Sequence, residues 1–63
     1  MMNKNSEAKE RFLSTVYEHS TRAIENSNKL IDLAKKIVEA EDVGFVIDPD
    51  SVENAVKRIM GVD

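Results

Sequence analysis

The sequence predicts an all-α protein made of a long amphipathic helix folded back on a short C-terminal helix. No Gly or Pro occurs from Ser6 to Asp42, and this stretch is rich in Glu, Lys, Ala and Leu, which favour helices. Its apolar residues recur at spacings of three and four, which is the helical period. A second stretch with this spacing, from Pro49 to Met60, lies between residues typical of helix ends.

The long stretch has an apolar side and a charged side. Its apolar positions are Leu13, Val16, Tyr17, Ile24, Leu30, Ile31, Ala34, Ile37 and Val38, with the small residues Ser20, Ala23 and Ser27 on the same side. On the charged side, acids precede bases by four positions, as in Glu25–Lys29 and Asp32–Lys36, and each such pair stabilises a helix by about 0.2–0.5 kcal/mol. We interpret the charged side as a solvated helix surface.

The continuity of this helix depends on the segment Glu25-Asn26-Ser27-Asn28. Asn and Ser favour caps and loops, so a turn at Asn26–Asn28 would give a three-helix bundle. Against a turn, the apolar and charged sides both pass through the segment in phase, and the Glu25–Lys29 pair spans it. We therefore expect one continuous helix, with the three-helix bundle as the alternative.

The connection between the two helices has clear end signals. Gly44 is suited to the left-handed conformation that closes a helix, and Gly61 is suited to the same role at the end of the second helix. The apolar run 45–47 is too short for a sheet and is expected to lie extended in the corner between the helices. Asp48 is a candidate N-cap, and Pro49 fits the first helical position.

Length and composition allow a single domain. The chain has 63 residues, and we expect a disordered N-terminus at residues 1–5 and one helical domain at 6–63. It has no Cys, no apolar run long enough to span a bilayer and no secretory signal, which predicts a cytoplasmic protein without membrane contact. The net charge of −3 argues against a nucleic-acid partner.

No pattern in the sequence predicts catalysis. The single histidine, His19, has no carboxylate or thiol at helical spacing, and no serine lies in a nucleophile motif. The acids at Asp48, Asp50 and Glu53 do not match a calcium loop and are explained by helix capping. We expect no enzyme, no catalytic, cofactor-binding or metal-binding residues, and no cofactor.

A comparison of helix lengths predicts a homodimer. A continuous helix from Ser6 to Asp42 would be about 55 Å long, whereas the second helix would be about 18 Å and would cover only the Leu30–Val38 half. An antiparallel dimer would cover the rest and form a four-helix bundle of coiled-coil type. The residues expected in self-association are Leu13, Val16, Tyr17, Ser20, Ala23, Ile24 and Ser27.

The function predicted from these features is a small non-catalytic protein–protein interaction module, a bacterial or phage regulator or inhibitor that acts as a homodimer. Its unidentified protein partner would be bound through Phe45, Val46, Lys35 and Lys36. One alternative is a structural or assembly component of a phage particle or a larger complex. A weaker alternative is a nucleic-acid-binding regulator that would use Arg22 and Lys29 together with the two lysines at 35 and 36.

Overall fold

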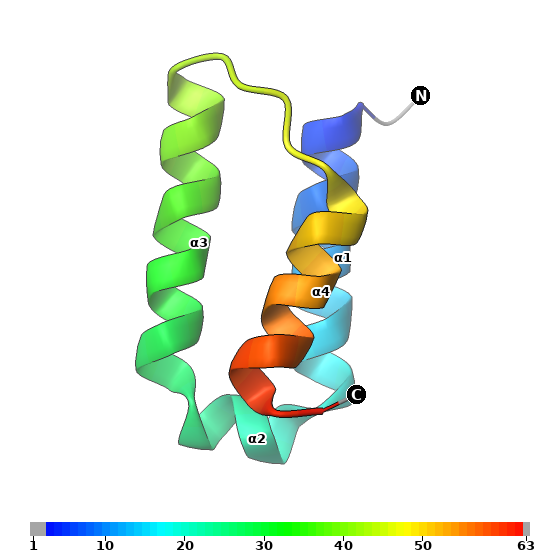
Figure 1. Ribbon diagram of the computed structural model, residues 1–63, viewed down its shortest axis with the longest axis vertical. Coiled ribbons are helices and arrows are strands. Elements are labelled where there is room, and N and C mark those ends of the chain that lie inside the picture. Colours follow the sequence, from blue (N-terminus) through cyan, green and yellow to red (C-terminus); the bar gives the residue numbers. More distant parts are fainter. Residues whose placement is uncertain (1–2, 63) are drawn as a thin grey trace.

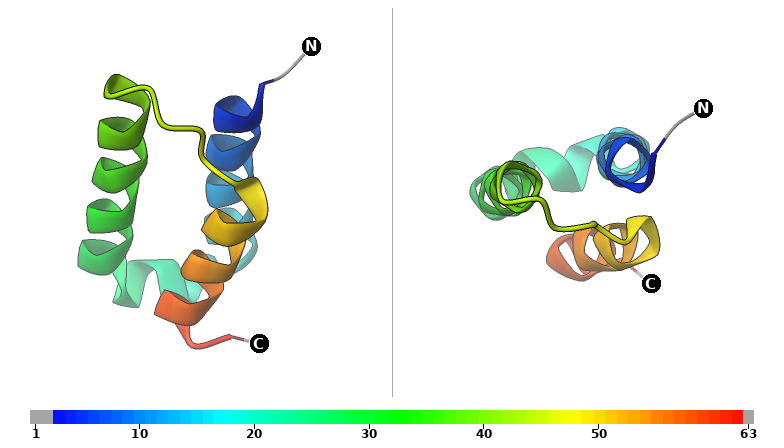
Figure 2. Two further views of the ribbon diagram at one scale, coloured as in Figure 1. Left: turned by 45° about the horizontal axis from the view of Figure 1, so that its top comes forward. Right: turned by 90° about the horizontal axis from the view of Figure 1, so that it is seen from above.

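The computed structural model describes residues 3–62 and is helical throughout its regular structure. The helices are α1 (Lys4–Glu18), α2 (Ser20–Glu25), α3 (Ser27–Asp42) and α4 (Pro49–Met60). α1 descends to the short α2, α3 runs back up, and α4 descends beside α1 (Figure 1). The views in Figure 2 show α1, α2 and α3 in one layer and α4 in a second. α4 packs mainly on α1 and touches α3 more sparingly.

The expectation of one continuous helix from Ser6 to Asp42 is wrong. The chain leaves the helical conformation at His19 (φ −117°, ψ 47°) and at Asn26 (φ −110°, ψ 23°). At the second break, Nδ2 of Asn26 donates a hydrogen bond of 3.2 Å to the Arg22 carbonyl oxygen, an example of an Asn side chain competing for backbone groups. The three-helix alternative is nearer to the structure, because the chain does turn at Asn26.

The apolar and charged sides stay in phase because each break is only one residue long. The Ala23 amide donates to the His19 carbonyl at 2.9 Å, and the Leu30 amide donates to the Asn26 carbonyl at 3.1 Å. The helical hydrogen bonding therefore resumes at once, while the axis changes direction. Periodicity alone does not detect a change of axis of this kind.

The N-terminal helix begins earlier than predicted. The Ser6 amide donates a hydrogen bond of 2.8 Å to Oδ1 of Asn3, which caps α1. Residues 3–5, which the sequence placed in a disordered terminus, are thus part of the folded structure. Met1 and Met2, the rest of that prediction, lie outside the described residues.

The predicted ends of α3 and α4 are confirmed. α3 ends at Asp42, and Gly44 has a positive φ of 83°. Asp48 accepts hydrogen bonds from the Asp50 amide (3.2 Å) and the Ser51 hydroxyl (3.0 Å), and Gly61 closes α4 with a φ of 70°.

The core is small and lies mainly between α1 and α4. Its buried apolar residues are Ala8, Leu30, Ile37, Val52, Val56 and Met60. α1 contributes Ala8 and the buried Thr15, which are small enough for α4 to approach closely. The predicted apolar side supplies only Leu30 and Ile37 to this core.

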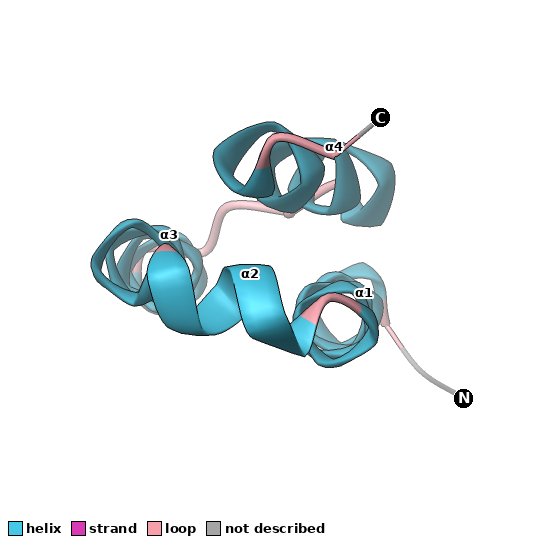
Figure 3. Cartoon of the chain, turned by 90° about the horizontal axis from the view of Figure 1, so that it is seen from below, coloured by secondary structure: helices cyan, strands magenta, loops and turns pink. Residues whose placement is uncertain are grey.

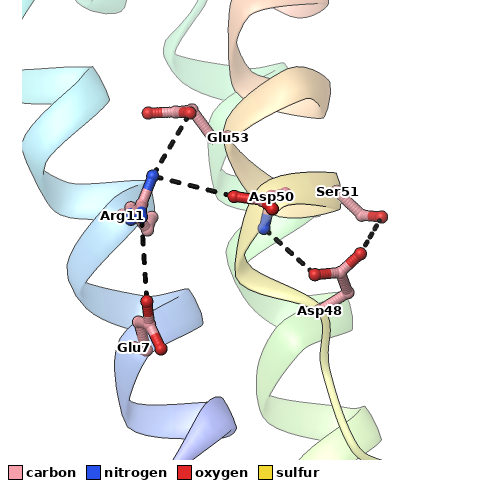
Figure 4. Close-up of polar contacts among 6 residues, drawn as sticks. All are labelled: Glu7, Arg11, Asp48, Asp50, Ser51 and Glu53. Atoms are coloured by element: carbon pink, nitrogen blue, oxygen red, sulfur yellow. Dashed lines mark hydrogen bonds and ion pairs between the residues drawn. The ribbon is translucent and has the colours of Figure 1, made fainter.

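Polar contacts hold the elements together at both ends. Near the start of α4, Arg11 lies 3.4 Å from a Glu53 carboxylate oxygen, 3.8 Å from one of Asp50 and 3.7 Å from one of Glu7 (Figure 4). Near its end, Arg22 donates a hydrogen bond of 3.2 Å to the Met60 carbonyl oxygen, where a cation also suits the negative end of the helix.

The side chain of Asn5 fixes the loop between α3 and α4. Its Nδ2 donates to the Phe45 carbonyl oxygen (3.3 Å), and its Oδ1 accepts from the Ile47 amide (2.8 Å). Ile47 packs against the core, as expected for a corner residue. Phe45 and Val46, in contrast, are 69% and 72% exposed, so only one residue of the apolar run fills the corner.

Replacing Asp48 with Ala should lower the free energy of unfolding by about 0.5–2 kcal/mol, because the first turn of α4 loses its cap. Chemical denaturation followed by circular dichroism measures the change. Asp48→Asn is the control and should retain most of the stability, since Asn caps about as well as Asp. Equal stability of the Ala variant and the parent would contradict the capping role.

Replacing Asn5 with Ala should lower the free energy of unfolding by about 1–2 kcal/mol, because two hydrogen bonds to the α3–α4 loop are lost. Asn54→Ala is the matched control, since Asn54 is an exposed helical asparagine of α4. The gain in helix propensity should be at least as large for Asn54, which lies inside its helix, as for Asn5 in the first turn of α1, so a lower stability of Asn5→Ala than of the control reports the lost hydrogen bonds to the loop. Two equal melting curves would show that Asn5 does not hold the loop.

Candidate functional site

The side of the molecule away from α4 carries an apolar groove between α1 and α3. Figure 3 shows α1, α2 and α3 in a row with α4 on the other side. The groove has a volume of about 240 Å³ and is lined by Phe12, Val16, Ala23, Ser27, Leu30, Ile31 and Ala34. Ser27 is the one polar residue in this lining. The groove is therefore suited to apolar side chains.

A second hollow continues this groove along α3. It is lined by Ile31, Ala34, Lys35, Val38 and Glu39, so it shares two residues with the first. On α1, Leu13 and Tyr17 share a helix face with Val16 and are 64% and 85% exposed. We call this combined surface the open face and define it by Leu13, Val16, Tyr17, Ala23, Ser27, Ile31, Ala34 and Val38.

Most residues predicted for self-association belong to the open face. Val16, Ala23 and Ser27 line the groove, and Leu13 and Tyr17 lie beside it. Ile24 follows Ala23 on α2 and is 78% exposed. Ser20 begins α2 and is exposed, but it does not line the groove.

The structure does not bring the predicted partner-binding residues together. Phe45 and Val46 are exposed on the loop between α3 and α4. Lys35 lies at the edge of the open face. Lys36 lies on another side of α3, where it lines a groove shared with α4.

This α3–α4 groove was not predicted from the sequence. It has a volume of about 350 Å³ and is lined by Lys29, Asp32, Leu33, Lys36, Ala55, Arg58 and Ile59. Leu33, Ala55 and Ile59 are half-buried, whereas the charged residues are exposed. A helical signal was present in the sequence, because Lys29, Leu33 and Lys36 are spaced by four and three. The sequence alone does not show that this side of α3 lies next to α4, so the groove could not be predicted from this spacing.

The other polar clusters offer less. The carboxylates around Arg11 are engaged by its guanidinium, and within residues 3–62 no group of three or more His, Cys, Asp or Glu side chains could hold a metal ion. His19 is half-buried at the junction of α1 and α2. In the same part of the chain, no helix combines the length and apolar character needed to span a bilayer.

The grooves are therefore the surfaces on which a functional interpretation depends. Comparisons with known proteins gave no match: no family model fits the sequence, and no curated protein or solved structure is significantly similar to it.

Proposed function

We propose that the chain is a small non-catalytic protein–protein interaction module that acts as a homodimer, with the open face as its dimer interface. The observation that supports this proposal is the continuous apolar surface along α1 and α3. Apolar surface of this extent on a small protein marks an interaction site.

The chain buries little surface for its size. A compact monomer of 7.1 kDa exposes about 4,100 Å², whereas this chain exposes 4665 Å². Association with a second copy through the open face would reduce this exposed area. Within residues 3–62 the core has six buried apolar side chains, which leaves stability to be gained by association.

The charges along α3 support a symmetric arrangement. Lys35 and Glu39 line the hollow beside Ile31 and Val38. If two α3 helices pack antiparallel about a two-fold axis, Lys35 meets Glu39 of the partner subunit and the reverse pair forms as well. Of the residues between them, Val38 is apolar and exposed, and it would lie close to the axis. The two pairs of opposite charge favour this antiparallel arrangement.

Dimerisation in this way leaves two surfaces for a target protein. One is the exposed Phe45–Val46 loop, which the two hydrogen bonds of the Asn5 side chain hold in place. The other is the α3–α4 groove on the opposite side of α3. A small dimer that presents two copies of such surfaces fits the role of a regulator or inhibitor that acts by binding.

The dimer is tested by Leu13→Glu combined with Ile31→Glu. These side chains are 64% and 52% exposed, so the monomer should still fold, but an interface would have to bury unpaired carboxylates. Sedimentation velocity should show a dimer for the parent in the micromolar range and a monomer for the variant. The melting temperature of the parent, but not of the variant, should rise with protein concentration.

Val43→Glu combined with Val46→Glu is the matched control. This variant also replaces two exposed apolar side chains, 69% and 72% exposed, with carboxylates. Both positions lie in the loop between α3 and α4, away from the open face. This variant should sediment as the parent does. A parent that is monomeric up to millimolar concentration, or a control that dissociates as completely as the open-face variant, would refute the proposed dimer.

A further inference from the structure

The α3–α4 groove combines an apolar floor with a basic rim. Leu33 and Ile59 pack against the core on one side and line the groove on the other, together with Ala55. Lys29, Lys36 and Arg58 line its edges and are exposed. The only acid in the lining is Asp32. The local charge is therefore positive, although the chain as a whole has a net charge of −3.

The three cations of the rim are not neutralised by the fold. Within residues 3–62, the ion pairs engage Lys9 and Arg11, and none involves Lys29, Lys36 or Arg58. The Glu25–Lys29 and Asp32–Lys36 pairs expected from the sequence are therefore not formed. Arg22, another cation near the end of α4, is bonded to the Met60 carbonyl oxygen. The rim cations thus lie ready to pair with carboxylates of another molecule.

We propose that the α3–α4 groove binds an acidic amphipathic helix of a target protein, whose apolar side chains contact Leu33, Ala55 and Ile59 while its carboxylates pair with Lys29, Lys36 and Arg58. α3 and α4 run in opposite directions (Figure 1). The groove is lined by residues 29–36 of α3 and 55–59 of α4, about two helical turns of α3, and a helix of a partner can lie in an apolar groove of this kind. The inference rests on the proposed role as an interaction module, and it specifies the chemistry of the target.

Nucleic acid fits this groove less well. Phosphate groups would gain nothing from the apolar floor, and Asp32 would repel them. Three cations neutralise few phosphates, whereas nucleic-acid binding depends on many such contacts. A carboxylate-bearing helix uses both the floor and the rim, because it supplies apolar and charged side chains at helical spacing.

The probe is a fluorescein-labelled peptide of 16 residues, the length of α3, with leucines at spacings of three and four and glutamates beside them. Fluorescence anisotropy should show saturable binding to the parent protein that weakens as salt is raised. A peptide with Gln in place of Glu and a peptide with Ala in place of Leu should each bind more weakly. Because the net charge of the protein is negative, its overall field does not attract the acidic peptide.

The decisive comparison uses two double variants of equal charge. Lys29→Gln combined with Lys36→Gln should weaken binding of the acidic peptide about fivefold to tenfold, because both lysines lie on the rim. Lys4→Gln combined with Lys57→Gln removes the same charge outside both the groove and the open face, and this variant should bind the peptide as the parent does. An equal loss in both variants, or no binding by the parent, would overturn the proposal.

Two further measurements separate the possible failures. A labelled single-stranded DNA of similar length that binds more tightly than the acidic peptide would replace the proposal with a nucleic-acid interface. Sedimentation of the Lys29/Lys36 variant should match the parent, since neither lysine lies on the open face. If the Lys29/Lys36 variant loses peptide binding but remains a dimer, the groove is supported as the binding site. If the parent is a monomer but binds the acidic peptide as described, the proposed dimer is refuted and the groove proposal stands.

Discussion

The close contact between α1 and α4 is the constraint on which the rest of the structure depends. Ala8 and Thr15 are small, so α4 lies close against α1, and Val52, Val56 and Met60 are buried there. α3 adds Leu30 and Ile37 to the buried core, and its Leu33 packs against it half-buried. The rest of α3 is left with one groove on the α4 side and the open face on the other. Both proposed interaction surfaces thus follow from the packing of α4, which lies close against α1 and touches α3 more sparingly.

The helix ends could be predicted from the sequence because they depend on local chemistry. The capping by Asp48 and the positive φ values of Gly44 and Gly61 require only neighbouring residues, and these predictions are confirmed. The course of the chain from Ser6 to Asp42 could not be predicted in the same way. Its breaks at His19 and Asn26 change the direction of the axis, and Leu30 and Ile37 of α3 are buried in the core, a tertiary contact that periodicity does not report.

The candidate sites were predictable to a similar degree. The apolar exposure of Leu13, Tyr17 and Ile24 agrees with the sequence, although the argument from a long uncovered helix was wrong. Leu13 and Tyr17 are exposed because α1 turns Ala8 and Thr15, which have less apolar surface, toward α4. The rim of the α3–α4 groove draws Arg58 and Lys36 from positions far apart in the chain, and no spacing rule connects them.

The pairing of the first and last helices has a consequence for the folding reaction. Hydrogen bonds that join α1 and α2 to the C-terminal part of the chain link residues 38 to 42 positions apart. Most small helical proteins fold rapidly because their contacts are local, whereas here the main contact closes a loop of about 40 residues before much apolar surface is buried. Folding should therefore be slower than is usual for helical chains of this size. α4 follows the other three helices in the sequence, so the nascent chain cannot complete this core until α4 has been synthesised.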